Sequence, residues 1–324
     1  MPEVSEKDVS EAAIRIVGQV ERTPLVKARI RGQDLWLKCE CLQTGGSFKL
    51  RGATNRLMQL DDQARRRGVV AFSSGNHARG VAIAARRLGI TATIVMPSDA
   101  PQVKIDGTRG EEAEIVFYDR RTEDRAAIAA GLAATSGATV VPSFDDAMIV
   151  AGQGTVGLEI LGQLSQAGEP APARIVIPTG GGGLASGIAL ACPDATIVCV
   201  EPENWDDMLR SLDLGRIVPV AKDAAPTLCD ALQTLQVSPI TFGILKERGA
   251  EAIAVSEQDV AEAVRFAWVE HQLMVEPGGA VALAALLSGK VAVEAGTVAV
   301  LSGGNVDPAL HARIVKDAQP AEAR

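Results

Sequence analysis

Short runs of apolar, often β-branched residues recur along the chain and constrain its fold more than any other feature. Within each run the apolar residues are nearly consecutive, which is typical of strands buried on both faces of a parallel sheet. An exposed antiparallel strand would instead alternate apolar and polar residues. The runs are residues 69–72, 91–96, 114–118, 139–141, 174–179, 196–202, 252–255 and 297–303.

The segments between these runs have helical periodicity. Residues 76–89 and 121–137 are two examples, and each ends at a glycine, a residue that is common just beyond a helix. Strands that alternate with helices predict an α/β architecture. With 324 residues, 47% of them hydrophobic, the chain is long enough for two domains.

Composition excludes several classes of protein. The formal net charge of −8 argues against binding to nucleic acid or to a membrane surface. No apolar run approaches the roughly 20 residues of a membrane span, and the charged start "MPEVSEKDVSEAA" lacks a signal-peptide core, so we expect a cytoplasmic protein. The five cysteines have no zinc-like spacing and are expected to be reduced and mostly buried, with Cys39 and Cys41 alternating as strand neighbours.

Polar or glycine-rich turns follow four of the predicted strands. They are "SSGNHARG" after 69–72, "GGGGLASG" after 174–179, "EPENWDD" from residue 201 and "SGGNVD" after 297–301. Ligands of open parallel sheets bind at the carboxyl ends of the strands. We therefore expect the four turns to form one site.

A lysine at a helix start is the second unusual feature. In "GGSFKLRGATNRL", residues 45–57, Ser47 is a good candidate for the N-cap and Lys49 falls in the first turn. A cation is unfavourable there, because a helix N-terminus carries partial positive charge. Lys49 is therefore either a solvated surface lysine or a lysine placed for chemistry.

The turn "TGGGGLASG", from Thr179 to Gly187, offers four consecutive glycines. Their backbone amides can surround an anion, aided by the N-terminus of the following helix. The Walker lysine is missing and the Rossmann spacing is absent, so the turn suits a single phosphate monoester. A tight strand–helix turn remains the alternative. A phosphate site together with Lys49 suggests pyridoxal phosphate, whose aldehyde bonds to a lysine amine.

Six motifs in order resemble the serine/threonine dehydratase and serine racemase family. They are "SFKLRGATN", "SSGNHARG", "GGGGLASG", "EPENWDD", "VEPGGA" and "LSGGNVD", between about residues 22 and 307. The resemblance implies a fold-type-II pyridoxal phosphate enzyme with two open, mostly parallel, twisted sheets flanked by helices. It implies a large domain of residues 1–52 and 144–324, a small domain of residues 53–143, the cofactor in the cleft between them, and a homodimer.

The family implies roles for individual residues. Lys49 resembles the Schiff-base lysine and general base at Cα, and Phe48 the residue against one ring face. Ser302 resembles the hydroxyl that faces the pyridine nitrogen. Unlike a carboxylate, a hydroxyl does not keep that nitrogen protonated, and the weaker electron withdrawal favours β-elimination over transamination. The other positions are Asn76 at the phenolic oxygen, the phosphate cup of Gly180, Gly181, Gly182, Gly183 and Leu184, and the α-carboxylate loop with Ser73, Asn76 and His77.

The motif "EPENWDD" resembles a divalent-cation site of the family. Glu201, the carbonyl of Trp205 and Asp207 would supply oxygen ligands. Hard oxygen ligands suit Mg²⁺, with Ca²⁺ or Mn²⁺ as alternatives, rather than zinc. The other interpretation is a solvated acidic loop.

The resemblance implies a dehydratase, that is, an ammonia-lyase converting a β-hydroxy amino acid such as threonine or serine to a 2-oxo acid and ammonia. Because the chain ends soon after "LSGGNVD", without a regulatory domain, we expect a catabolic enzyme.

Ser74 resembles the racemase acid/base on the face opposite Lys49, so a serine racemase with side elimination is an alternative. Arg125, or Arg121, could meet a second carboxylate of hydroxyaspartate, or could belong to a solvated helix start. The region of these arginines also resembles hydroxyectoine-degradation dehydratases.

Two further classes are kept open. One is a catalytically inactive ligand-binding relative or scaffold, against which the intact Lys49, Ser302 and glycine turn argue. The other is a β-replacement enzyme such as a cysteine synthase. Cys41, where the family usually has asparagine, and Ala231, where many members have glycine, leave the substrate fit undetermined.

Overall fold

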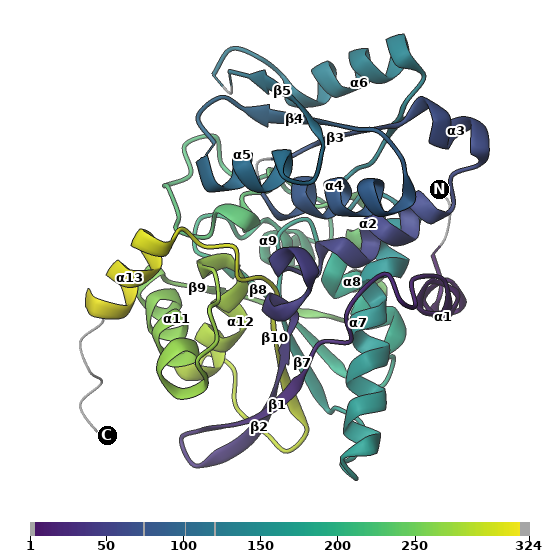
Figure 1. Cartoon of the computed structure of the whole chain (residues 1–324). Helices are drawn as coiled ribbons and strands as arrows, with labels where there is room; N and C mark the ends of the chain where they lie inside the picture. Colours follow the sequence, from purple (N-terminus) through teal and green to yellow (C-terminus); the bar gives the residue numbers. More distant parts are fainter. Residues whose placement is uncertain (1–3, 74, 101, 120, 318–324) are drawn as a thin grey trace.

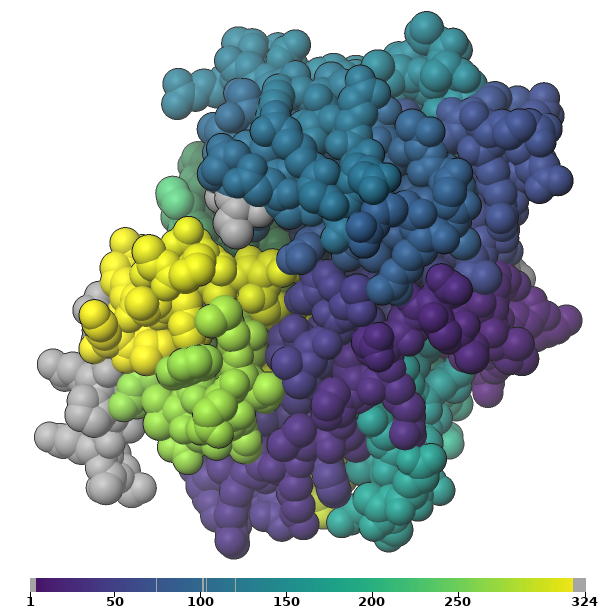
Figure 2. Space-filling model, in the orientation of Figure 1, coloured from purple at the N-terminus to yellow at the C-terminus, as the bar shows by residue number. Residues whose placement is uncertain are grey.

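The protein is described here by a computed structural model, over residues 4–73, 75–100, 102–119 and 121–317. Its strands form two separate sheets, one of four strands and one of six (Figure 1). Helix α2 (Lys49–Met58) lies between them. In the space-filling view, the purple and yellow residues nearest the two ends of the chain form much of the lower part of the molecule, below the four-stranded part (Figure 2).

The four-stranded sheet is parallel and covered by helices on both faces. Its elements are α3 (Asp62–Arg67), β3 (Val69–Phe72), α4 (Asn76–Leu88), β4 (Ala92–Pro97), α5 (Gln102–Arg109), β5 (Glu114–Tyr118), α6 (Arg125–Ser136) and β6 (Thr139–Val140). The strand order is β5-β4-β3-β6. Apolar side chains of α4 and α5 pack on one face, and those of α6 pack on the other.

The six-stranded sheet has the order β1-β2-β10-β7-β8-β9 and is parallel except for the antiparallel pair β1–β2. Its strands are β1 (Leu25–Ile30), β2 (Gln33–Cys39), β7 (Arg174–Pro178), β8 (Thr196–Pro202), β9 (Glu251–Val255) and β10 (Thr297–Leu301). The helices of this half are α1 (Glu6–Arg15), α7 (Ala147–Gln166), α8 (Gly183–Ala191), α9 (Asp207–Leu214), α10 (Pro239–Glu247), α11 (Glu257–His271), α12 (Pro277–Leu287) and α13 (Pro308–Asp317). Three short 3₁₀ segments are η1 (Glu40–Leu42), η2 (Thr44–Gly46) and η3 (Asp230–Leu232).

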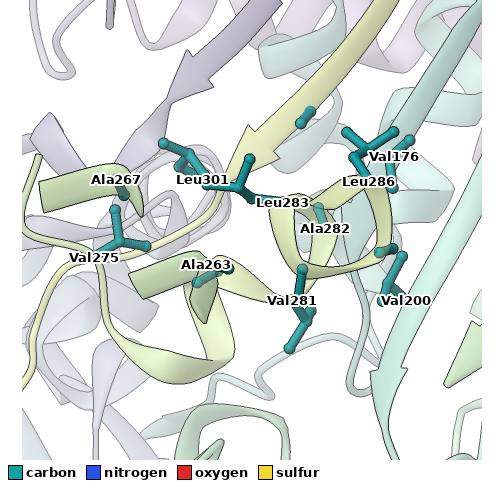
Figure 3. Close-up of a cluster of buried hydrophobic side chains, with 14 of the residues drawn as sticks. Val176, Val200, Ala263, Ala267, Val275, Val281, Ala282, Leu283, Leu286 and Leu301 are labelled. Atoms are coloured by element: carbon teal, nitrogen blue, oxygen red, sulfur yellow. The ribbon is translucent and has the colours of Figure 1, made fainter. Parts of the chain in front are cut away.

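Helix α12 packs between the six-stranded sheet and α11. Figure 3 shows that Leu283 and Leu286 of α12 face the sheet, where they lie near Leu301 of β10 and Val176 of β7. All of its residues from Pro277 to Leu286 are buried. A helix that is apolar all round is typical of a protein interior. The opposite face of the sheet is covered by α1, α7, α8 and α10.

The predicted α/β fold with two mostly parallel sheets is confirmed. All eight predicted strands are present, as β3 to β10, whereas the hairpin β1–β2 was not predicted.

Ser47 is not the N-cap of α2, which is Phe48; instead, Ser47 forms a β-bridge with Gly303. Cys41 lies in η1 rather than in a strand with Cys39. All five cysteines are free and buried, as expected. The four-stranded sheet lies within residues 53–143, but the two domain boundaries stay a prediction.

None of the helices described here is both long enough and apolar enough to cross a lipid bilayer.

A buried ion cluster fixes the first turn of α2. The side chain of Arg51 is fully buried and donates to Glu40 at 2.8 Å and to Glu159, on α7, at 2.6 Å. Lys38 of β2 is also fully buried and donates to Glu159 at 2.6 Å. Burial by itself would raise the pKa of Glu40, but the Arg51 guanidinium outweighs it and holds that pKa below its usual value. Because an unpaired buried charge is costly, the cluster ties α2 to α7 and to the six-stranded sheet.

Helices α7 and α8 meet at glycines, which makes a stability test possible. A Cβ on Gly187 would lie 2.4 Å from the nitrogen of Gly154 and from the carbonyl oxygen of Val150. Since backbone atoms cannot rotate away, Gly187→Ala should lower the free energy of unfolding by about 1–3 kcal/mol. The control is Gly131→Ala in α6, where an added methyl group meets nothing within 4 Å and should raise that free energy by about 0.5–1 kcal/mol. Urea denaturation measures both, and a neutral Gly187→Ala would contradict the packing described.

Candidate active site

A cavity of about 410 Å³ lies between the two sheets, at the carboxyl ends of β3, β7 and β10. Three of the four predicted turns therefore meet, as expected for parallel sheets. Of the predicted cofactor- and substrate-binding residues, those that line the cavity are Phe48, Lys49, Ser73, Asn76, His77, Arg125, Gly180, Gly181, Gly182, Gly183, Leu184 and Ser302. Ser74 lies outside the described residues. The fourth turn, with Glu201, Trp205 and Asp207, is not part of the cavity wall.

Lys49 is the first residue of α2 and is half-buried in the cavity wall rather than solvated. Its Nζ donates to the carbonyl of Ser143 at 3.0 Å and lies 5.1 Å from the ring centroid of Phe48. Burial lowers the pKa of Lys49 to about 8, since the charged amine loses hydration there. The amine is therefore partly neutral, and so nucleophilic, near physiological pH.

The glycine turn has little room for side chains. A Cβ on Gly181 would lie 2.2 Å from the ring of Phe144, and Gly182 has φ +84°, a conformation that L-residues rarely adopt. The Thr241 hydroxyl donates to the carbonyl of Gly181 at 2.8 Å and fixes the turn from behind. Helix α8 begins at Gly183. Backbone amides at a helix start, bordering a cavity and free of side chains, fit a phosphate group.

A chain of hydrogen bonds orients Asn76, the first residue of α4. Arg79 donates to Asn305 Oδ1 at 3.0 Å, and Asn305 Nδ2 donates to Asn76 Oδ1 at 2.8 Å. Asn76 Nδ2 donates to the carboxylate of Glu276. The side-chain oxygen of Asn76 is thus engaged by Asn305, and its remaining N–H is available to a ligand oxygen in the cavity.

Glu276 and Asn305 received no role from the sequence, although both lie in motifs that were identified, "VEPGGA" and "LSGGNVD". Burial, together with the charge of Asp230, raises the pKa of Glu276 to about 7. A carboxyl group that titrates near neutrality beside a cavity is a frequent property of functional sites. The two motifs were a signal for this pair, but only the fold brings their side chains to Asn76.

His77 and Ser302 complete the wall. His77 Nε2 lies 2.9 Å from the carbonyl oxygen of Val141, which can only accept, so Nε2 carries the proton. Burial, assisted by the charge of Lys49, lowers the pKa of His77 to about 3, and the ring stays neutral at physiological pH. Ser302 follows β10, and its carbonyl accepts from the N–H of Phe48 at 3.2 Å, which ties the end of β10 to the start of α2.

Glu201 and Asp207 meet at the end of β8, away from the cavity. The two oxygens of Glu201 accept from the N–H groups of Met208 and Leu209 at 2.9 and 2.8 Å. Both oxygens of Asp207 are buried without a hydrogen-bond partner. The two carboxylates are therefore not part of a solvated loop, and that alternative is wrong for them.

The pair of carboxylates fits a hard cation. Burial, together with the charge of Asp207, raises the pKa of Glu201 well above its usual value. A cation between the two groups would offset this repulsion and would satisfy the oxygens of Asp207. In the described part of the chain, no cluster of three or more His, Cys, Asp or Glu side chains suits a metal ion. Backbone carbonyls and water would have to complete the coordination shell.

Known proteins resemble this chain over nearly its whole length. A family model described as "Pyridoxal-phosphate dependent enzyme" matches residues 16–303. An L-threo-3-hydroxyaspartate ammonia-lyase from a Pseudomonas species is 42% identical, over 95% of this chain and 98% of its own. An L-threonine ammonia-lyase from Thermotoga maritima is 39% identical, over 95% of this chain and 77% of its own. The structure of maize serine racemase superposes with a TM-score of 0.89 at 33% identity, covering 95% of this chain and 96% of its own.

The pKa of Lys49 predicts how the apoprotein takes up pyridoxal phosphate. With a pKa of about 8, about a tenth of the Lys49 amine is neutral at pH 7, against less than a thousandth for an ordinary lysine. The rate of the absorbance change on mixing should rise with pH, reach half of its maximum near pH 8 and then level off. Lys49→Ala should show no such change, whereas the exposed-lysine control Lys7→Ala should behave as wild type. A rate that keeps rising to about pH 10 would contradict the burial of Lys49.

Proposed function

Because the chain belongs to the family of pyridoxal-phosphate dependent enzymes, we propose that it is an ammonia-lyase for β-hydroxy amino acids. The observation that carries the proposal is a half-buried lysine of lowered pKa on the wall of a cavity that a glycine turn also borders. Lys49 would bind the cofactor aldehyde, and the amides of Gly180 to Leu184 would bind its phosphate. Asn76 would meet the phenolic oxygen and Ser302 the pyridine nitrogen.

The residues of the cavity suit β-elimination. Pyridoxal phosphate, when bound, withdraws electrons from Cα of an amino acid and makes the Cα proton acidic. The amine of Lys49 can accept that proton near neutral pH. Ser302, which lines the cavity, would offer a hydroxyl rather than a carboxylate to the pyridine nitrogen and would leave that nitrogen without a negative partner. In the net reaction the amino acid loses water, takes up another water and yields one 2-oxo acid and one ammonia.

The substrate-binding residues are proposed from their places in the cavity wall. Ser73, Asn76 and His77 surround the start of α4, where an α-carboxylate would meet backbone N–H groups. Arg125 begins α6, and its guanidinium carbon lies 5.7 Å from the ring centroid of Phe72. Arg121 is exposed and is not part of the cavity wall, so we propose Arg125 of the two as a substrate contact.

Racemisation is the second candidate activity. It is favoured by the likeness to maize serine racemase and by Ser74, which stands beside Ser73 in the sequence. We propose that Ser74 acts on the face opposite Lys49 if the enzyme interconverts enantiomers.

A substrate panel tests the function. Purified holoenzyme is given L- and D-serine, L- and D-threonine and threo-3-hydroxyaspartate, and the 2-oxo acid, ammonia and both enantiomers are measured. We expect 2-oxo acid and ammonia in equal amounts from at least one β-hydroxy amino acid, and none from Lys49→Ala. Interconversion of enantiomers without 2-oxo acid would identify a racemase instead. A product formed only with sulfide would identify a β-replacement enzyme.

We also propose a structural divalent cation, Mg²⁺ or Ca²⁺, held by Glu201, Asp207 and the carbonyl of Trp205. Its support is the buried, unpartnered carboxylate of Asp207. The ion would hold the start of α9 against β8, because Glu201 is the last residue but one of that strand and accepts from two amides of the helix.

Removal of the cation should destabilise the protein. A ligand that binds only the folded state adds roughly 2.7 kcal/mol at a hundredfold excess over its dissociation constant. EDTA should therefore lower the melting temperature and the activity together, and Mg²⁺ or Ca²⁺ should restore both. Glu201→Gln should abolish the response to EDTA, while the nearby exposed-residue control Glu203→Gln should retain it. A wild-type melting curve that EDTA leaves unchanged would refute the cation.

A further inference from the structure

An ion pair crosses the cavity from one half of the molecule to the other. Lys104 belongs to α5, which covers the four-stranded sheet, and Asp230 begins η3, which lies in the six-stranded half. Both residues line the cavity, and the ammonium of Lys104 contacts the carboxylate of Asp230. Neither residue has a place in the site as it was predicted from the sequence.

The two partners differ in burial. The side chain of Lys104 is 13% exposed, and that of Asp230 is 46% exposed. Asp230 can therefore turn into water at little cost, whereas Lys104 would stay in the wall. A charge held in a largely buried position requires a counter-ion. If Asp230 leaves, another carboxylate has to take its place.

Lys104 also lies beside the expected position of an amino acid. A Cβ on Gly75 would be 3.7 Å from Lys104 Nζ, and Gly75 is part of the loop that we propose for the α-carboxylate. The charge of Lys104 lowers the pKa of Glu276, against the larger effects of burial and Asp230. Since Glu276 binds Asn76, Lys104 is near the residues that would surround the ligand.

We propose that Lys104 binds the second carboxylate of a four-carbon, acidic β-hydroxy amino acid, in exchange for Asp230. This deepens the proposed function and rests on it. One carboxylate replaces another at the same ammonium group, so no additional net charge is buried. The hydroxyl side chains of serine and threonine cannot replace Asp230, and they leave the ion pair intact. The pair thereby selects acidic substrates over neutral ones.

Two single variants should act in opposite directions. Lys104→Met removes the ammonium, and the ratio of kcat/KM for threo-3-hydroxyaspartate to that for serine should fall about ten- to hundredfold, the usual range for a lost charge-assisted hydrogen bond. Asp230→Asn removes the competing carboxylate, and the same ratio should rise. In the double variant, Met and Asn replace Lys104 and Asp230 with neutral side chains of nearly the original size, so no unpaired charge remains. It should therefore keep the low ratio of Lys104→Met even if that single variant is unstable.

A purely structural ion pair would behave differently. Both single variants would then loosen the protein and change the ratio in the same direction, which would overturn the proposal. Equal losses with serine and with hydroxyaspartate in Lys104→Met would assign Lys104 to the α-carboxylate. A fall in the ratio for Arg125→Gln but not for Lys104→Met would assign the second carboxylate to Arg125.

A binding measurement separates this inference from the proposed function. Succinate, a four-carbon dicarboxylate, should raise the melting temperature of the wild-type holoenzyme more than butyrate, its monocarboxylate match. That difference should vanish in Lys104→Met and grow in Asp230→Asn. If the enzyme releases 2-oxo acid from serine but succinate and butyrate act alike, the inference fails and the proposed function stands. If succinate behaves as expected but no β-hydroxy amino acid is converted, the proposed function fails instead.

Discussion

The pairing of Arg51 with Glu40 and Glu159 is the interaction on which the site depends. Arg51 stands two residues after Lys49 on α2, and its guanidinium joins that helix to η1 and to α7. Lys49 can lose its hydration only because this turn is held in the interior. A buried ion pair that is broken on one side costs far more than it contributes intact. The cluster therefore fixes the backbone of the turn that carries Lys49 to η1 and to α7.

Desolvation then sets the protonation states around the cavity. The same physical cause lowers the pKa of Lys49 and of His77 and raises that of Glu276. Burial disfavours whichever form is charged, so bases become weaker and acids become weaker. Near neutral pH this leaves a partly neutral amine, a neutral imidazole and a carboxyl group close to its midpoint. Near neutral pH the amine and the carboxyl group can therefore gain or lose a proton at little energetic cost, whereas the imidazole of His77 stays neutral.

Those parts of the fold that follow from local sequence were predictable. Strands β3 to β10 were found because strands of a parallel sheet that helices cover on both faces carry apolar residues at consecutive positions. The hairpin β1–β2 was missed because its edge strand alternates apolar residues with the exposed Lys27 and Arg29. Ser47 was wrongly expected as an N-cap because its pairing with Gly303 depends on a segment far away in the sequence.

In the candidate site, too, residues whose role depends on local sequence were predictable, and residues whose role depends on distant contacts were not. Lys49 and the glycine turn could be identified from short motifs, since their chemistry depends on residue type and local backbone. The roles of Asn305, Glu276 and Lys104 could not, because each depends on one partner that the fold brings near. Asn305 and Glu276 are identified only by their contacts with Asn76, and Lys104 only by its contact with Asp230.

The position of β10 has a consequence for how the chain acquires its structure during synthesis. This strand is inserted between β2 and β7, although it follows β9 in the sequence. Until residues 297–301 leave the ribosome, β2 and β7 present two unpaired edges, which are sites where other chains can add. Sheets closed by such distant segments fold slowly, because the loop entropy is lost before the contacts form. The nascent protein therefore exposes the centre of its main sheet until its last residues are made, and aggregation is favoured most during that part of synthesis.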